Sequence, residues 1–224
     1  MERRMMEDFK FYEVGGKIRD ELLGLKSKDV DYVAVPSEEL LTLGVDAKDM
    51  FIILWKYLDA QGFEIFLTAW ECYTIRAKFP EGYKYQGVAD FVMARKEVGY
   101  VPGTRTPIVE PGNLYDDLSR RDFTVNAMAK DPDTGEIIDY FNGKTHLARR
   151  LLVTPLDPIT TFDDDPLRIL RGIRFSITKR LLVSQDMWQV MKSYDYFNKM
   201  PVVSEERICL LYTSPSPRDM RRSR

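Results

Sequence analysis

Two aspartates separated by a single residue, Asp29 and Asp31, begin an alternating apolar segment that runs to Val35. The alternation predicts a β-strand over residues 29–35, and residues i and i+2 of a strand point to the same face. The two carboxylates are therefore expected side by side, roughly 6.5–7 Å apart at the backbone. Carboxylate oxygens are ligands that Mg²⁺ takes in proteins, so this pair is a candidate divalent-metal site.

A glycine pair and an arginine precede these aspartates in the sequence. Gly15 and Gly16 leave backbone N–H groups uncovered at the start of a helix expected over residues 18–23, and Arg19 lies one helical turn further on. Such a turn can cradle phosphate groups. A glycine pair alone is most often only a turn, and two spaced aspartates alone are most often solvated. Together and in this order they indicate nucleotidyl transfer, in which paired metal ions clamp the attacking and leaving oxygens.

Composition and charge limit the other chemistry that this chain can carry. Apolar residues make up 44% of it and charged residues 30%, which is typical of a globular domain, and no apolar stretch is long enough for a bilayer. Its cysteines are Cys72 and Cys209 and its single histidine is His146, too few for a disulfide framework or a histidine-based metal site. We therefore expect a reducing compartment such as the cytoplasm and no membrane partner. The net charge of −2 predicts that any nucleic-acid contact is a local patch.

The order of apolar patterns predicts a sheet-containing half followed by an all-helical half, with the seam near Thr160. Residues 97–113 are rich in glycine and proline and predict a long loop, and we hypothesise that its part from Gly99 to Gly112 gates the incoming nucleotide. Strands are expected over residues 10–14, 29–35, 64–69, 73–79, 88–94 and 137–140, and helices over 18–23, 38–43, 48–61, 114–129, 186–198 and from Pro166 onward.

Two further blocks combine carboxylates with arginines. Residues 120–127 read Arg-Arg-Asp-Phe-Thr-Val-Asn-Ala, which alone is compatible with a charged helix start. In residues 162–171, Asp165 and Arg168 stand at a helix start with a spacing of three, so that both side chains share one face. A capping ion pair there would contribute only about 0.2–0.5 kcal/mol. The alternative is that the carboxylate acceptor and the guanidinium donors hydrogen-bond the edge of a nucleobase.

With the glycine turn, the aspartate pair and these two blocks in this order, the chain from about Phe11 to Ile208 resembles the class II tRNA nucleotidyltransferases, or CCA-adding enzymes, and the bacterial poly(A) polymerases. The resemblance implies an α+β fold, in which a nucleotidyltransferase head with a mixed sheet of about five strands and helices is followed by an all-α neck. We expect the head domain over residues 1–159 and a truncated helical neck over 160–208. Residues 209–224 contain Ser-Pro-Ser-Pro and no apolar face, and are expected to be a non-native or disordered tail.

The resemblance also implies a role for each residue of these motifs. A tRNA 3′-hydroxyl would attack the α-phosphate of CTP or ATP, and pyrophosphate would leave. Asp29, Asp31 and Asp90 would be the catalytic carboxylates and would hold Mg²⁺. The nucleotide would be bound at the triphosphate by Gly15, Gly16 and Arg19, near the ribose and phosphates by Arg121 and Asp122, and at the base edge by Asp165 and Arg168, with Arg171 lining the same pocket.

Three other functions stay open on the sequence. Poly(A) addition shares the motifs of the head. A non-catalytic RNA-binding module could use the same fold, although three converging carboxylates argue against an inert copy. A fragment with the right site but without the helices that grip tRNA would be inert. Two departures from the family pattern, Asp164 where glutamate is common and His146 where aspartate is common, remove no metal ligand.

Overall fold

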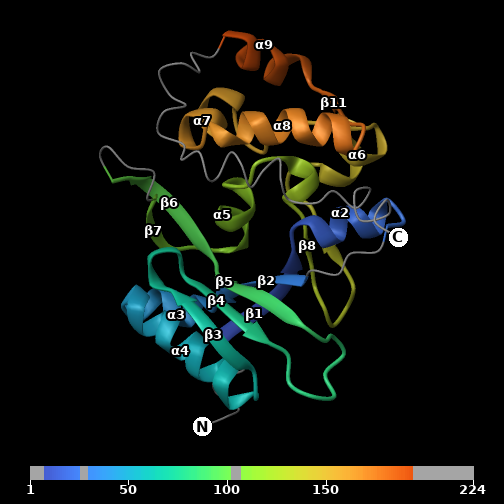
Figure 1. Cartoon of the computed structure of the whole chain (residues 1–224). Helices are drawn as coiled ribbons and strands as arrows, with labels where there is room; N and C mark the ends of the chain where they lie inside the picture. Colours follow the sequence, from blue (N-terminus) through green and yellow to red (C-terminus); the bar gives the residue numbers. More distant parts are fainter. Residues whose placement is uncertain (1–7, 26–29, 102–106, 194–224) are drawn as a thin grey trace.

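A seven-stranded mixed sheet forms the first part of the fold (Figure 1). The structure is a computed structural model that describes residues 8–25, 30–101 and 107–193. The strands of this sheet are β1 (Phe9–Val14), β2 (Val30–Pro36), β3 (Glu64–Ala69), β4 (Thr74–Lys78), β5 (Val88–Met93), β8 (Ala129–Lys130) and β9 (Ile137–Ile138). They lie in the order β3-β4-β5-β2-β1-β8-β9. Strands β2 and β5 run parallel, and the other neighbouring pairs run antiparallel.

The mixed sheet with its helices confirms the predicted fold class, although it has seven strands rather than about five. The difference lies at one edge of the sheet. Strand β8 has only two residues, which is too short for an alternating pattern to reveal, and β9 covers only Ile137–Ile138 of the expected 137–140. Both short strands extend the sheet beyond β1.

Helices cover the two faces of the sheet because its strands are apolar on both. Helices α3 (Glu38–Thr42) and α4 (Ala47–Ala60) lie on one face, where Phe51 packs in a cluster with Tyr32 and Phe91. Helix α5 (Leu114–Ser119) lies on the other face, where Leu118 packs in a cluster with Val33. Tyr32 and Val33 are neighbours in β2 but belong to clusters on opposite faces of the sheet, because successive strand residues point to opposite faces.

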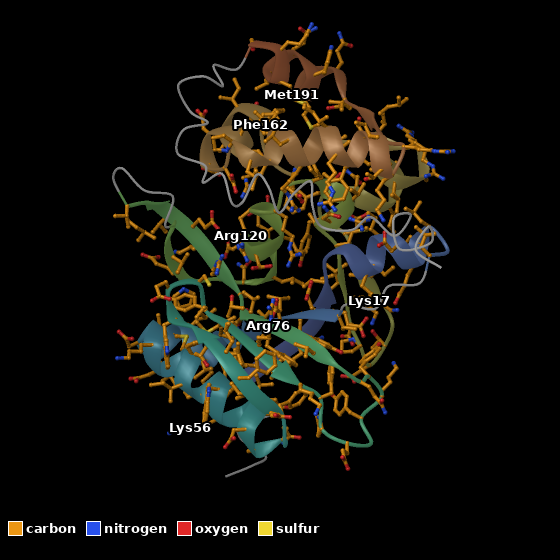
Figure 2. All side chains as sticks on the ribbon, in the orientation of Figure 1. Lys17, Lys56, Arg76, Arg120, Phe162 and Met191 are labelled. Carbon is orange, nitrogen blue, oxygen red and sulfur yellow. The ribbon has the colours of Figure 1, made fainter. Side chains whose placement is uncertain are left out.

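A second layer of helices lies beyond α5 in Figure 1 and has a core of its own. It comprises α6 (Gly143–Ala148), α7 (Pro158–Asp164), α8 (Leu167–Thr178) and α9 (Gln185–Ser193), with a short parallel pair formed by β10 (Leu151–Leu152) and β11 (Leu182–Val183). Phe162, Ile169 and Met191 are buried in this core together with Phe123, which ties the helices to the sheet half (Figure 2). The rest of the predicted neck and the tail at 209–224 lie outside the described residues, and the domain limits stay predictions.

Two expectations about secondary structure were wrong. The long loop expected over 97–113 is largely the antiparallel pair of β6 (Arg95–Tyr100) and β7 (Pro107–Pro111), and residues 102–106 lie outside the described residues. Its prolines are tolerated because a two-stranded ribbon consists only of edge strands. The helix expected over 114–129 ends at Ser119, and a 3-10 turn, η2 (Thr124–Asn126), follows.

Helix α5 ends early because Phe123 packs in the core of the second layer. The Arg120 and Arg121 side chains fold back onto Asp117 in the last turn of the helix, at 2.9 Å for the Arg121 Nη2. The backbone of Phe123 is extended (φ −138°, ψ 148°), which directs its ring into the core of the second layer. The two ion pairs have the spacing of helix neighbours and are compatible with a longer helix, so the extended backbone at Phe123 is what ends it. Among the described helices, none combines the length and the apolar character that crossing a membrane requires.

Candidate active site

A cavity of about 450 Å³ lies between the glycine turn after β1, the Arg120–Asp122 segment and the start of α8. It gathers segments that are far apart in the sequence. All eight residues predicted to bind the nucleotide line this cavity, and so does Asp31; the predicted residues are Gly15, Gly16, Arg19, Arg121, Asp122, Asp165, Arg168 and Arg171. The structure therefore brings the glycine turn, Asp31 and the two blocks at residues 120–127 and 162–171 to one place, although it does not by itself assign their roles.

The carboxylates of Asp31 and Asp90 stand next to each other across the sheet. They are register partners on the parallel strands β2 and β5, so both side chains point to the same face. Asp31 reaches the cavity, whereas Asp90 lies one strand further from it. Asp29, the third predicted ligand, lies outside the described residues. Within the described ranges, no three acidic, histidine or cysteine side chains gather closely enough to hold a metal ion by themselves.

The donor set nevertheless fits Mg²⁺, which is commonly bound by one or two carboxylates together with substrate phosphates and water. The glycine turn lies directly beside this pair. A Cβ atom on Gly15 would stand 3.4 Å from the Asp31 Oδ2 and 3.8 Å from the Arg121 Nη1. The φ angle of Gly15 is +81°, a conformation that favours glycine. A carboxylate, a guanidinium and a bare backbone turn thus meet at one corner of the cavity.

A buried lysine fixes the helix that follows the glycine turn, α2 (Gly16–Leu22). The Lys17 Nζ donates to the Glu13 Oε2 at 2.7 Å and to the Tyr85 hydroxyl at 2.9 Å (Figure 2). Burial lowers the pKa of Lys17, but Glu13 and Tyr85 outweigh it, and the net pKa is raised. The ammonium group therefore stays charged and anchors the start of α2 to β1.

Arg19 and Asn126 form one side of the cavity. The Arg19 Nη1 donates to the Asn126 Oδ1 at 2.6 Å, and the Asn126 Nδ2 donates to the Asp122 Oδ1 at 3.0 Å. The guanidinium of Arg19 also lies 5.2 Å from the centre of the Phe175 ring, within the range of a cation–π contact. These bonds hold Arg19, of which only 6% is exposed, with its face toward the cavity.

Asp122 binds a second arginine of the cavity, Arg171. Its Oδ2 accepts from the Arg171 Nε at 2.9 Å and Nη2 at 2.6 Å, and its Oδ1 also accepts from the Phe123 N–H at 2.8 Å. Burial raises the pKa of this carboxyl, but Arg171, Asn126 and the Phe123 N–H outweigh it, and the net pKa is lowered. Asp122 is therefore ionised and positions Arg171, while its predicted place near the ribose stays a prediction.

Asp117 holds the two arginines of the Arg-Arg-Asp block. It is fully buried, and it accepts from the Arg120 Nε at 3.1 Å and from the Arg121 Nη2 at 2.9 Å. Burial raises the pKa of its carboxyl, but the two guanidinium groups outweigh this effect and lower the pKa to about 2. The buried Nε of Arg121 has no hydrogen-bond partner within the described part of the chain.

The residues predicted to read the base lie at the junction of α7 and α8. The Asp165 Oδ1 accepts from the Leu167 N–H at 2.9 Å and so begins α8. Arg168 donates to the carbonyl oxygens of Thr161 at 3.1 Å and Arg120 at 2.7 Å, and its Nη1 lies 4.0 Å from the Asp164 Oδ2. Both side chains line the cavity. Base recognition by them stays a prediction.

Sequence reasoning missed four further residues of the cavity wall, namely Arg120, Asn126, Leu167 and Phe175. Asn126 carried a signal, because it is a polar residue inside the apolar run from Phe123 to Ala129. Phe175 carried no such signal, because an apolar residue that lines a cavity looks in the sequence like any apolar residue on the buried face of a helix. Outside the cavity, sequence reasoning also missed Arg76, which forms a two-atom contact with Asp90.

The fold is a mixed sheet in which two aspartates on neighbouring strands point to the same face, with a glycine turn beside them. This arrangement defines a nucleotidyltransferase head domain. The chain belongs to the poly(A) polymerase head-domain family, whose pattern matches residues 11–153. It is 33% identical over 203 residues to the multifunctional CCA protein of Nitrosomonas europaea, covering 89% of this chain and 42% of that protein. It is 32% identical over 204 residues to nucleotidyltransferase lcsQ of Purpureocillium lilacinum, covering 87% of this chain and 33% of that protein.

A solved structure is similar in fold as well. It is a tRNA nucleotidyltransferase in complex with a primer tRNA and an incoming ATP analogue, with a TM-score of 0.65 and 27% identity. The match covers 94% of this chain and 56% of that one. The chain thus spans less than half the length of the two sequence relatives and about half of the structural one.

Proposed function

We propose that this chain is the nucleotide-binding and metal-binding part of a tRNA nucleotidyltransferase, which adds CCA or part of it to tRNA 3′ ends from CTP and ATP. One observation carries the proposal: a single cavity is lined by Asp31 and by all eight residues expected to bind the nucleotide. The family assignment and the similarity to a multifunctional CCA protein support it. So does the structural relative, which holds a primer tRNA and an ATP analogue.

The residues of the cavity suit the binding of a nucleoside triphosphate. Arg19, Arg121 and Arg171 present guanidinium groups to it, each held by an acceptor of the protein, at Asn126, Asp117 and Asp122 respectively. Preorganised cations of this kind neutralise the charge of the phosphates without having to reorganise during the reaction. The bare turn at Gly15 and Gly16 lets the phosphates approach the backbone.

Asp29, Asp31 and Asp90 would hold Mg²⁺, which when bound neutralises charge on the reacting α-phosphate and on the attacking hydroxyl. The transfer itself needs no covalent intermediate on the protein. The 3′-hydroxyl of the RNA gives up its proton to Asp31, Asp90 or water, and its oxygen forms the new bond to the α-phosphorus. The bond from the α-phosphorus to the oxygen that bridges to the β-phosphate breaks, and pyrophosphate leaves. Asp165 and Arg168 would select the base through the acceptor and donor atoms of its edge. The cytoplasm is the compartment that we propose for this reaction.

The test is incorporation of labelled nucleotide into a tRNA that lacks its 3′ end, with CTP, ATP or both. We expect ordered addition of C, C and A, and loss of incorporation in Asp31→Asn. Runs of A from ATP alone would instead support a poly(A) polymerase. No incorporation by a folded chain that still binds CTP and the tRNA would refute the enzyme for this chain and support a binding module. A folded chain that binds the nucleotide but not the tRNA would be an inert fragment.

A further inference from the structure

Arg76 lies opposite the metal carboxylates because of strand alternation and register. In β4, Ile75 and Ala77 are both fully buried against the α4 side of the sheet, so Arg76 between them points to the opposite face (Figure 2). Register pairs Arg76 with Asp90 on β5, and Asp90 with Asp31 on β2. The three side chains therefore form one row across three strands, on the face that carries the candidate active site.

The contact between Arg76 and Asp90 uses both oxygens of the carboxylate. The Arg76 Nε donates to the Asp90 Oδ1 at 2.6 Å and its Nη2 donates to the Oδ2 at 2.7 Å. This is the bidentate geometry that gives guanidinium–carboxylate pairs their directional preference.

The pair lies at the surface of the sheet. The Arg76 side chain is 47% exposed and that of Asp90 is 27% exposed, so neither side chain belongs to the buried core. The guanidinium of Arg76 lies where it can change how readily the Asp90 carboxylate binds a cation. A carboxylate has about four lone-pair positions on its two oxygens, and the guanidinium takes one on each oxygen. A divalent cation that approaches Asp90 meets both the occupied oxygens and the positive charge of Arg76.

We propose that Arg76 is a resident counter-ion of Asp90 that a divalent cation must displace, so that Arg76 sets the metal affinity of the active site. This inference rests on the proposed function, since it takes Asp90 as a metal ligand. Arg76 is thus a positioning residue: it holds the carboxylate in a fixed orientation without the metal and competes with the metal for it. The flexible, half-exposed stem of Arg76 lets the guanidinium move away without disturbing the sheet.

The measurement is the binding of Mn²⁺ alone to the full chain, followed by the electron paramagnetic resonance signal of the free ion and by calorimetry. Arg76→Gln keeps a polar stem but removes the charge and the fork, and should bind Mn²⁺ about two- to tenfold more tightly than the unchanged chain. Arg76→Lys keeps the charge without the fork and should fall between the two. Circular dichroism of each variant checks that the fold is intact.

A matched control is available on the same strand. Lys78 lies two residues beyond Arg76 on the same face, and its Nζ pairs with the Glu64 Oε2 at 3.3 Å instead of with a metal carboxylate. Lys78→Gln removes the same charge from the same face and should leave the Mn²⁺ affinity within about twofold. In an Asp90→Asn background, Arg76→Gln should lose its effect, because the carboxylate through which it acts is gone.

The outcomes separate this proposal from the proposed function. Equal or weaker Mn²⁺ binding by Arg76→Gln overturns the role of Arg76, as does a gain of the same size in Lys78→Gln or the absence of measurable Mn²⁺ binding. Ordered nucleotide addition by the same preparation would leave the proposed function standing in each of these cases. If Mn²⁺ binding responds as expected but no nucleotide is incorporated, the role of Arg76 stands and the proposed function fails.

Discussion

Replacing Asp117 with asparagine should destabilise the folded chain by about 2–4 kcal/mol at neutral pH. Asp117 is fully buried and is held by two guanidinium groups, those of Arg120 and Arg121. An amide is a neutral stand-in of the same shape as the protonated acid. The difference between the ordinary pKa of 3.8 and the pKa of about 2 in the fold therefore corresponds to roughly 2–3 kcal/mol. That figure already contains the loss of the counter-charge for the two guanidinium groups, and removing one partner of a buried ion pair typically costs about 3–5 kcal/mol.

The pH dependence distinguishes this electrostatic cause from a simple loss of packing. The pKa of Asp117 is lower in the folded chain, so its stabilisation is fully present above the unfolded-state pKa and is lost as the pH falls toward about 2. Urea unfolding, followed by tryptophan fluorescence and circular dichroism, measures the free energy of unfolding between about pH 7 and pH 3. The difference between the two proteins should be constant down to about pH 5 and should shrink below about pH 4.

The neighbouring Asp116 provides the control. It belongs to the capping box of α5, where the Asn113 N–H donates to its Oδ2 at 2.9 Å, and an asparagine would keep an acceptor there. Asp116→Asn should change the free energy of unfolding by no more than about 0.5 kcal/mol. A loss below about 0.5 kcal/mol in Asp117→Asn, or a loss that stays constant down to pH 3, would refute the reasoning.

Three further predictions concern packing, nucleotide binding and metal dependence. A Cβ atom on Gly143 would overlap the carbonyl oxygen of Thr124, so Gly143→Ala should lose about 2 kcal/mol or more of unfolding free energy in urea; an unchanged midpoint would contradict the packing. Arg171→Lys removes the two-atom contact with Asp122 and should weaken CTP binding about tenfold in calorimetry, whereas an equal affinity would place Arg171 outside the nucleotide site. Chelation by EDTA should stop nucleotide incorporation and added Mg²⁺ should restore it, while incorporation that persists in EDTA would exclude a metal-dependent transfer.

The local elements of the site could be predicted because their signals are local. The strand β2, confirmed from Val30 onward, places Asp31 on the face opposite Tyr32 because successive strand residues point to opposite faces. The turn at Gly15 likewise follows from residue type. The extent of α5 could not be read in this way, because apolar residues continue past Ser119 at helical spacing while Phe123 is drawn into a different core.

The contacts that complete the site could not be predicted from any local pattern. Arg171 meets Asp122 across 49 residues of sequence, and Arg19 meets Asn126 across 107. Arg76 was visible only as a charged residue in an expected strand, and its partner depends on how β4 pairs with β5. A shift of one residue in that pairing would turn the side chain away from Asp90 to another neighbour.

The sequence by itself determined which chemical groups the candidate site contains: carboxylates at a strand spacing, a glycine turn without side chains and arginines in an ordered set of motifs. Residue type and short-range spacing are enough for that, since they fix which atoms each segment can offer and on which face. Only the tertiary structure decided that Asp31 and Asp90 point to the same face of the sheet, and that Arg76 forms an ion pair with Asp90. Strand register and helix packing follow from the burial of the whole core, so no segment carries that information alone.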